Sequence, residues 1–324
     1  MSGDSSSITL PEVVNTATPV SSSVSALQAP YASRKIDLTF TLGTGDFGIS
    51  GLNQLTFSGL RVYAHLVNVI FPHMASECLI RVYGMSLNHM KQLSVAGLLY
   101  EGRKNNTVQV SAGDDTSGMT TVANATIVEA YPNLNGAADE RHFYVYASGI
   151  IPEIQLKPTT PSSYPGSVPV SQILQTLVGQ VGYTLQNNSV NATLAQPYFW
   201  GTIWQQIQSC VRAADCFAYL DTINRILIIW PKNAAPPSNT TVTVSPATGM
   251  IGYPEFEMTR IIVRTLFSPM FAVGPGGTVL VQSTLGAANN AMLTLNLVVH
   301  DLASQLPGGP WMTTLVGTPP LGVR

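Results

Sequence analysis

The residues with the clearest chemical potential lie near the end of the sequence, where His300 and Asp301 are followed by Ser304. A base, an orienting carboxylate and a nucleophile are the groups that a hydrolytic triad needs. In a strand, however, adjacent side chains point to opposite faces, so His300 and Asp301 are not expected to bond to each other. The sequence also contains neither a Gly-x-Ser-x-Gly elbow nor a His-Glu-x-x-His helix. These residues therefore do not predict a hydrolase.

Other acidic and glycine-rich segments have simpler interpretations. Asp114 and Asp115 lie in a Gly/Ser-rich stretch, which is typical of a turn whose carboxylates bond their own backbone. The segment Gly43–Gly48 lacks the Gly-Lys-Ser/Thr ending of a phosphate loop, so a hairpin turn is predicted there. A glycosidase needs two carboxylates in one cleft. The sequence gives no reason to pair the available candidates, which are Glu153, Glu255 and Glu257.

The cysteines and aromatic residues give no clear site either. Cys78, Cys210 and Cys216 make no even disulfide framework, and no nearby Cys/His pair completes a metal site. Buried free thiols in a reducing compartment are predicted instead. One aromatic cluster is open to two interpretations, a sugar-stacking patch or, more typically, core and interface anchors; it comprises Tyr198, Phe199, Trp200 and Trp204. The sequence thus predicts no enzyme, and no catalytic, cofactor-binding or metal-binding residue.

The composition points to a chain that other proteins cover. Of its 324 residues, 45% are hydrophobic and only 10% are charged, with a net charge of -2; an average soluble domain is roughly 25% charged. Obligate interfaces are depleted in charge, so an assembly subunit is favoured over a neutral, polar monomer. No general affinity for nucleic acid is implied. The two longest uncharged stretches are broken by Pro and Gly, so stable membrane insertion is not expected. No secretory signal is predicted at the N-terminus.

The first half of the chain is predicted to be mainly strands. In residues 36–42 apolar and polar side chains alternate, and similar patterns occur at 55–70, 77–83, 108–115, 121–130 and 141–147. Ser86 is expected to cap a short helix whose apolar side carries Leu87, Met90 and Leu93. A short helix within a run of strands indicates a Greek-key-like or split barrel.

The period of the pattern changes after a Pro/Ser-rich segment, residues 158–169, which is expected to be a linker. Ser171 is expected to cap a helix that Gly182 ends. The segment Thr202–Gln205 fits a capping box at the start of a second helix. Together with a strand at 183–186 and a hairpin at 217–230, these helices predict a compact α+β module. Short alternating segments between Gly and Pro then predict a second small barrel or sandwich over 240–315.

Two sets of short motifs resemble a known family. The later set resembles the C-terminal barrel of baseplate hub proteins from contractile-tailed bacteriophages; it comprises Gly252–Pro254, Thr265–Pro269, His300, Ser304-Gln305 and Pro307–Thr313. The earlier set resembles the first barrel of those proteins; it comprises Arg34–Asp37, Gly59–Arg61, Ile80–Met85, Met90, Leu93 and Ala112–Asp115. The resemblance spans roughly residues 34–318.

The resemblance implies a mainly β chain with an α+β part. It implies an extended N-terminal arm (1–33), a tube-like β-barrel (34–157), an inserted α+β domain (158–236) and a second tube-like β-barrel (237–324). The arm has too few large apolar residues to fold alone and is interpreted as an assembly strap, with a disordered tail as the alternative.

The implied function is that of a structural virion protein in the tail baseplate, assembled in the host bacterial cytoplasm. A homotrimer would join the hexameric tail tube to the trimeric central spike and form part of the channel for DNA and the tape-measure protein. Its partners would be the tube or tube-initiator protein, the spike and the baseplate wedge proteins, without specific nucleic-acid binding. No cofactor is implied. The alternatives are a glycan- or peptidoglycan-binding tail module, or the hub of a related contractile injection system, since the family is also related to type VI secretion spikes.

Overall fold

A computed structural model describes residues 33–48, 51–70, 76–95, 105–150, 158–232, 241–271, 274–284 and 289–319. The chain divides into two compact units, Met1–Ala32 and Ser33–Arg324. The predicted arm, except Ser33, therefore lies outside the described residues. Everything below concerns the second unit.

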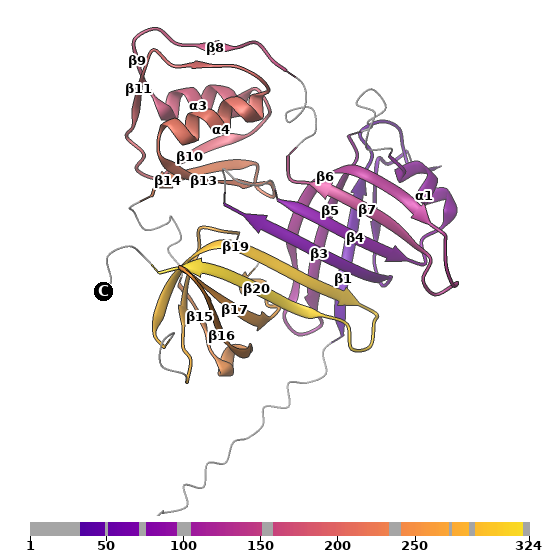
Figure 1. Ribbon diagram of the computed structural model, residues 1–324. Coiled ribbons are helices and arrows are strands. Elements are labelled where there is room, and N and C mark those ends of the chain that lie inside the picture. The colour runs from indigo at the N-terminus through magenta and orange to yellow at the C-terminus, as the bar shows by residue number, and fades with distance from the viewer. Residues whose placement is uncertain are drawn as a thin grey trace, which may run out of the picture. The chain divides into compact units, whose positions relative to one another are not determined.

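The first β region is a set of antiparallel strands that follow one another in the sheet in the order β3, β4, β7, β6, β5, β1 and β2 (Figure 1). Their bounds are β1 Arg34–Thr41, β2 Gln54–Phe57, β3 Arg61–Val69, β4 Glu77–Tyr83, β5 Thr107–Asp114, β6 Gly118–Asn133 and β7 His142–Ser148. The 16-residue β6 pairs with β5 through its first half and with β7 through its second. Register shifts occur in both pairings, so one bent strand connects two parts of the sheet.

Strict alternation in these strands builds the main core. In β3 every second residue is buried, from Val62 to Asn68, and β1, β4 and β7 show the same period. The helix α1 (Leu87–Leu93) adds Met90 and Leu93. The cluster is completed by residues from far along the chain, Phe267, Leu302 and Trp311. The first β region thus depends on the C-terminal segment to close its core.

The α+β module has its own core. Helices α3 (Val170–Gly179) and α4 (Ile203–Ala213) pack together and against a three-stranded sheet of β10 (Thr184–Asn187), β13 (Cys216–Asp221) and β14 (Ile226–Pro231). Two small strand pairs complete the module, β8 (Ser162–Ser163) with β12 (Tyr198–Phe199), and β9 (Ser167–Pro169) with β11 (Thr193–Ala195). Figure 1 shows the two helices side by side in this module.

The C-terminal β region contains six strands and a small core. Its strands are β15 Thr241–Val244, β16 Met250–Glu257, β17 Arg260–Leu266, β18 Thr278–Val281, β19 Ala291–Ser304 and β20 Trp311–Thr318. The core holds ten buried residues, among them Val263, Leu293 and Leu315. β19 is long enough to pair with β18, β20 and also β3.

The pairing of β19 with β3 joins both β regions into one sheet. The register runs from Leu297 opposite Val69 to Ser304 opposite Val62. The sheet therefore follows the order β16-β17-β20-β19-β3-β4-β7-β6-β5-β1-β2, with β18 and β15 branching from β19. The mainly β fold with an α+β part is as expected. Among the described strands this path ends at β16 and β2, and no pairing that closes it into a barrel is detected.

Several local predictions were confirmed and three were wrong. Ser86 caps α1, and Thr202 and Gln205 form the predicted capping box. Leu87, the first residue of α1, is exposed and does not join Met90 and Leu93 in the core. α3 is capped at Pro169 without a side-chain bond, so Ser171 is not its cap. Residues 158–169 contain β8 and β9 and thus belong to the α+β module rather than to a linker.

Candidate interaction surfaces

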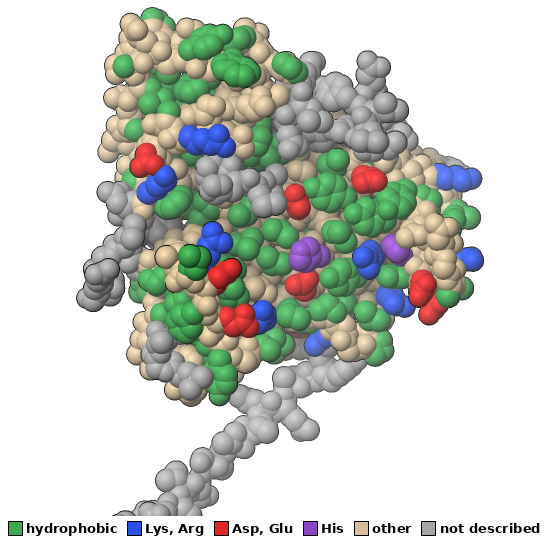
Figure 2. Space-filling model, in the orientation of Figure 1, with side chains coloured by type: hydrophobic (Ala, Val, Ile, Leu, Met, Phe, Trp, Pro, Cys, Tyr) green, Lys and Arg blue, Asp and Glu red, His purple; other side chains and the backbone are tan. Residues whose placement is uncertain are grey.

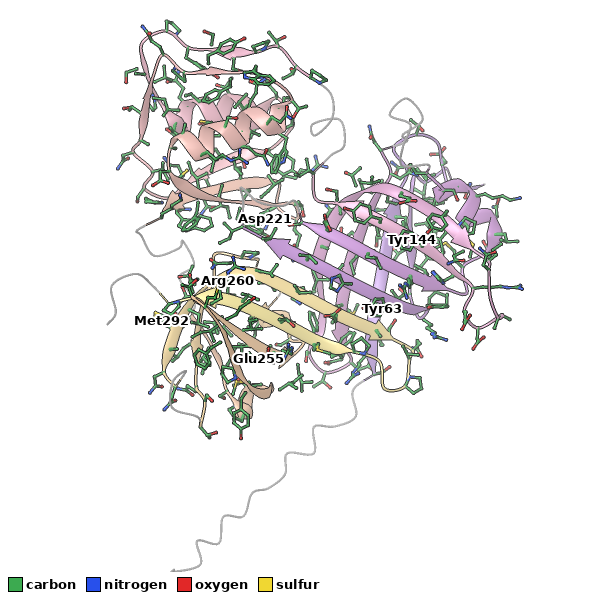
Figure 3. All side chains as sticks on the ribbon, in the orientation of Figure 1. Tyr63, Tyr144, Asp221, Glu255, Arg260 and Met292 are labelled. Carbon is green, nitrogen blue, oxygen red and sulfur yellow. The ribbon has the colours of Figure 1, made fainter. Side chains whose placement is uncertain are left out.

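No other described element covers the side of the joined sheet that faces away from the core. We call it the open face; it is defined by residues from β19, β3, β4, β7 and β6, namely Asp301, Arg61, Tyr63, His65, Glu77, Leu79, Arg81, Tyr83, His142, Tyr144, Tyr146, Glu129 and Tyr131. Figure 2 shows this side as a hydrophobic surface with scattered charged and histidine side chains. Tyr63 and Tyr144 are labelled on it in Figure 3.

The register of the strands arranges the open face in rows. One row runs Asp301, His65, Leu79, Tyr146 and Glu129, each residue opposite the next on a neighbouring strand. Side chains opposite each other in neighbouring strands lie close enough to interact. The His65 Nδ1 to Asp301 Oδ1 distance is 2.7 Å, so this row contains a bond across the junction of the two β regions.

The next row consists of Tyr63, Arg81, Tyr144 and Tyr131. The Arg81 guanidinium lies 5.7 Å from the centroid of the Tyr63 ring. Tyr131 and Tyr144 pack with their centroids 5.0 Å apart. Beyond this row Arg61 lies 4.4 Å from the Tyr83 ring centroid. Both arginines of the open face are therefore engaged with aromatic rings.

The electrostatics of the open face are close to neutral. Its two arginines face three carboxylates, Glu77, Glu129 and Asp301, which gives one net negative charge when the histidines are neutral. Burial, together with Glu77, raises the pKa of Tyr146 to about 12. Burial also raises the pKa of Tyr63 and Tyr144, with Asp301 and Glu129 as further causes. Tyr63, Tyr144 and Tyr146 thus present protonated hydroxyls at neutral pH.

A second surface is the β16–β17 hairpin at the end of the sheet. Tyr253 is 58% exposed, Phe256 57% exposed and Met258 fully exposed. Residues of both parities are exposed along β16, so both faces of this edge strand are uncovered. Glu255 forms an ion pair with Arg264 of β17, and Figure 3 labels Glu255 and Arg260 on this hairpin. Exposed apolar residues on an edge strand mark a contact site for another chain.

The suggestive pair His300 and Asp301 is divided between the two sides of β19, as strand geometry predicts. His300 is completely buried, and its Nδ1 lies 2.9 Å from Thr313 Oγ1. Its ring packs edge-on against Phe267. Burial lowers the pKa of His300 to about 4, and Asp301 opposes this effect. Ser304 donates to the Leu60 carbonyl oxygen at 3.0 Å, so no triad is assembled.

The other acidic candidates are structural. Asp114 accepts hydrogen bonds from the backbone N–H groups of Thr116 and Ser117, which lowers its pKa, and Asp115 pairs with Lys35. The turn prediction is confirmed. Residues 43–48 lie in the connection of the β1–β2 hairpin, also as predicted. Glu153 lies outside the described residues, and Glu257 is exposed on the hairpin.

The cysteines are buried free thiols, as predicted. Burial raises the pKa of Cys78 and Cys210 to about 12 and that of Cys216 to about 11, so all three stay protonated. Among the described residues no three His, Cys, Asp or Glu side chains gather as a metal site. Every helix in the described ranges is too short or too polar to span a bilayer.

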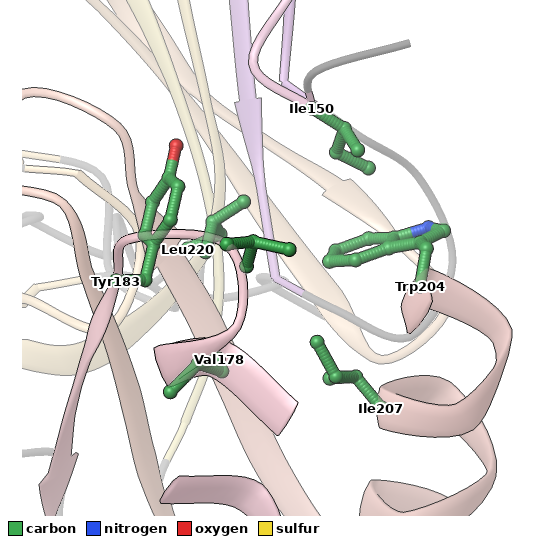
Figure 4. A pocket seen from close by; sticks show the side chains of 7 residues that line it. Ile150, Val178, Tyr183, Trp204, Ile207 and Leu220 are labelled. Carbon is green, nitrogen blue, oxygen red and sulfur yellow. The ribbon is translucent and has the colours of Figure 1, made fainter. Parts of the chain in front are cut away.

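The aromatic cluster of the α+β module does not form one patch. Tyr198 and Trp200 are exposed, whereas Phe199 and Trp204 are buried. Trp204 lines a small apolar cavity together with Ile150, Val178 and Ile207 (Figure 4). The cavity is lined by apolar surface, and Tyr183 and Leu220 also border it. Phe199 and Trp204 are thus core residues, as the interpretation of the cluster as core and interface anchors expected.

Sequence reasoning did not single out the open face. A signal was present, because β3, β4 and β7 each place Tyr, His, Arg or Glu opposite their aliphatic residues. Single charged residues in such positions are typical of a solvated strand. Only the register shows that the aromatic residues of three strands lie together.

Solved structures with the same fold include two tail proteins and one component of a type VI secretion system. A tail protein from Neisseria meningitidis MC58 is 10% identical, with a TM-score of 0.57, over 88% of this chain and 96% of that one. The 43 kDa tail protein of prophage MuSo2 from Shewanella oneidensis is 8% identical, with a TM-score of 0.54, over 88% and 97%. The E. coli c3393 protein, a component of the type VI secretion system, is 10% identical, with a TM-score of 0.54, over 80% and 73%. No curated protein sequence matches the chain.

The chain therefore shares its fold with phage tail proteins and with a component of a type VI secretion system. The profile of one family, described as baseplate hub gp41, matches residues 36–308. The chain belongs to this baseplate hub family. It is a structural component of the tail baseplate, as the sequence resemblance implied.

Proposed function

We propose that the chain forms a homotrimer that joins a hexameric tail tube to a trimeric central spike. A threefold spike offers three equivalent contacts, whereas a hexameric tube needs six. Each chain supplies two tube-like β domains, over residues 34–157 and 237–324, with the α+β domain 158–236 inserted between them. Three chains would then present six similar domains to the tube.

The observation that supports this proposal is the continuous sheet through both β regions. Because β19 pairs with β3, the open face extends from one region into the other without a break. We infer that three open faces surround the channel through which DNA and the tape-measure protein pass. DNA affinity scales with the number of cations presented. Only two arginines lie on the open face, both against tyrosine rings, so the lining would pass DNA without holding it.

The β16–β17 hairpin supports the contacts to neighbours. Its uncovered apolar residues would be buried against an adjacent copy, the tube, the spike or a wedge protein. The chain would act without catalysis and without a cofactor, and it would assemble in the cytoplasm of the bacterial host before joining the virion tail.

Light scattering of the purified chain, alone and with its tube and spike partners, tests the proposal. The chain alone, or its share of a complex with these partners, is expected to have three times the 34.5 kDa mass of one copy. The double variant Phe256→Ser/Met258→Ser should lose neighbour contacts, whereas Leu79→Ser on the open face should assemble normally, because a channel lining has no partner to lose. A persistent monomer in all mixtures, or assembly lost only through Leu79→Ser, would contradict the proposal.

A further inference from the structure

Two aromatic side chains of the α+β module project into solvent. Tyr198 is 60% exposed and Trp200 is 72% exposed, and we call them the exposed aromatic pair. Phe199 between them is buried, as expected for an extended segment whose successive side chains point to opposite sides. Tyr198 and Trp200 therefore lie on the same, outer side of this segment, where Tyr198 is opposite the exposed Ser163 of β8.

The exposed aromatic pair is held in place by Gln206 of α4, which is completely buried. Its amide oxygen accepts a hydrogen bond from the Ser162 hydroxyl at 2.6 Å. Its amide nitrogen donates to the carbonyl oxygens of Thr160 and Gly201, at 3.2 and 3.3 Å. Both segments of the β8–β12 pair are thus tied to the helix. A surface that is fixed before binding loses little conformational entropy when a partner covers it.

The part of the module that contains the exposed aromatic pair is uncharged. The sequence from 158 to 211 has no Lys, Arg, His, Asp or Glu. The core of a protein–protein interface is depleted in charge and enriched in aromatic residues. Trp and Tyr are also among the residues whose truncation most often costs a large share of the binding energy. These features are typical of the centre of an interface with another protein.

A protein matches the exposed aromatic pair better than a saccharide does. Small-molecule sites are concave and fix their ligand through a few placed polar groups. Tyr198 and Trp200 instead project from the module. The two glutamines of α4 that follow them in the chain are already engaged, Gln205 in the capping box and Gln206 in the contacts that tie the strand pair to the helix.

The number of modules in the assembly indicates which protein they meet. Each chain has two β regions but one α+β module, so the proposed trimer presents six β domains and three modules. A hexameric tube needs six equivalent contacts, which three modules cannot supply, whereas a trimeric spike needs three. We propose that the exposed aromatic pair is the docking site for the trimeric central spike, whose subunits each cover one pair with an uncharged, largely apolar surface. This inference rests on the proposed function and adds the residues through which the spike is held.

Calorimetry with the full chain tests the proposal, using the trimeric spike protein of the same tail as the probe. Trp200→Ser should weaken spike binding at least about 30-fold, because it removes the larger of two central anchors. Tyr198→Ser should weaken it about five- to thirtyfold. Ile223→Ser is the matched control, since Ile223 is exposed in the turn after β13 of the same module, and it should bind the spike as the unchanged chain does. All three variants should unfold at the same urea concentration as the unchanged chain, because the substituted side chains are exposed.

Light scattering of the same variants separates this inference from the hub proposal. Trp200→Ser and Tyr198→Ser should keep the oligomeric state and the tube binding of the unchanged chain. The inference is overturned if both variants bind the spike normally. It is also overturned if they lose self-association, which would put a second copy on the pair, or if they lose tube binding. Soluble peptidoglycan fragments that bind the unchanged chain but not Trp200→Ser would make the pair a sugar site and overturn it as well. An unchanged chain that forms no trimer in any mixture would instead contradict the hub proposal, and this inference would fall with it.

Discussion

The two β regions share one sheet but bury their apolar residues to different degrees. In the first region Phe40 and Phe143 are completely buried. In the C-terminal region the hairpin leaves Phe256 of the edge strand β16 and Met258 of the following turn in solvent. The first region is therefore stabilised mainly by a packed core, which Phe267, Leu302 and Trp311 complete, whereas the hairpin carries apolar surface that another chain would have to cover. Under the proposed function, the difference separates residues that fold the protein from residues that assemble it.

The largest expected effect is a difference in the free energy of unfolding between two Phe→Ala substitutions, one in each β region. Phe143→Ala should lower the free energy of unfolding by about 3–5 kcal/mol, because it leaves a cavity in a packed core. Phe256→Ala should change it by less than about 0.5 kcal/mol, because the ring is exposed. Urea unfolding of the isolated chain at fixed protein concentration measures both. Equal losses would show that the hairpin is part of the core and would break the comparison.

Acidification should lower the stability of the protein through His300, which lies on the buried side of the β3–β19 junction. Burial holds the pKa of His300 at about 4 against 6.5 in the unfolded chain, so the unfolded state binds more protons between these values. The contribution of His300 to stability should be constant above pH 6.5 and fall as the pH decreases from 6.5 to about 4, by up to about 3 kcal/mol.

Urea titrations across this pH window, for the unchanged chain and for His300→Gln, isolate the contribution of the imidazole. The variant should lose the slope between pH 6.5 and 4, whatever its absolute stability. A slope that persists in His300→Gln would assign the effect to other groups.

The smallest effect is expected on the exposed side of the same junction. His65 and Asp301 are bonded but partly exposed, so their coupling should be only about 0.2–1 kcal/mol. A double-mutant cycle with His65→Ala and Asp301→Ala measures it. A coupling of several kcal/mol would mean that this pair, rather than the buried side, holds the two regions together.

The sequence predicted local structure well. Alternation in residues 36–42 and 55–70 predicted the strands observed as β1 and β3 and their buried faces, because period two follows directly from strand geometry. The capping box at Thr202 was visible for the same reason, since its bonds join residues only three apart. The resemblance to baseplate hubs gave the class of fold.

Long-range pairing could not be predicted. The alternation of β19 shows which of its residues share a face, but any of the strands could have been its neighbour, and β3 lies more than 200 residues earlier. For this reason the open face, and the closure of the first core by Trp311, were missed. The exposure of Phe256 could not be predicted either. In the sequence, an apolar residue that a partner would cover looks the same as one that its own chain covers.

The most direct test is a cryo-EM reconstruction of the native tail tip at side-chain resolution. We expect three copies of the chain around one axis, with Tyr63, Leu79 and Tyr144 facing an open channel and the β16–β17 hairpin buried against a neighbour. An open face covered by another protein or turned to the outside of the baseplate, or a channel lined by unpaired lysine and arginine side chains, would contradict the account.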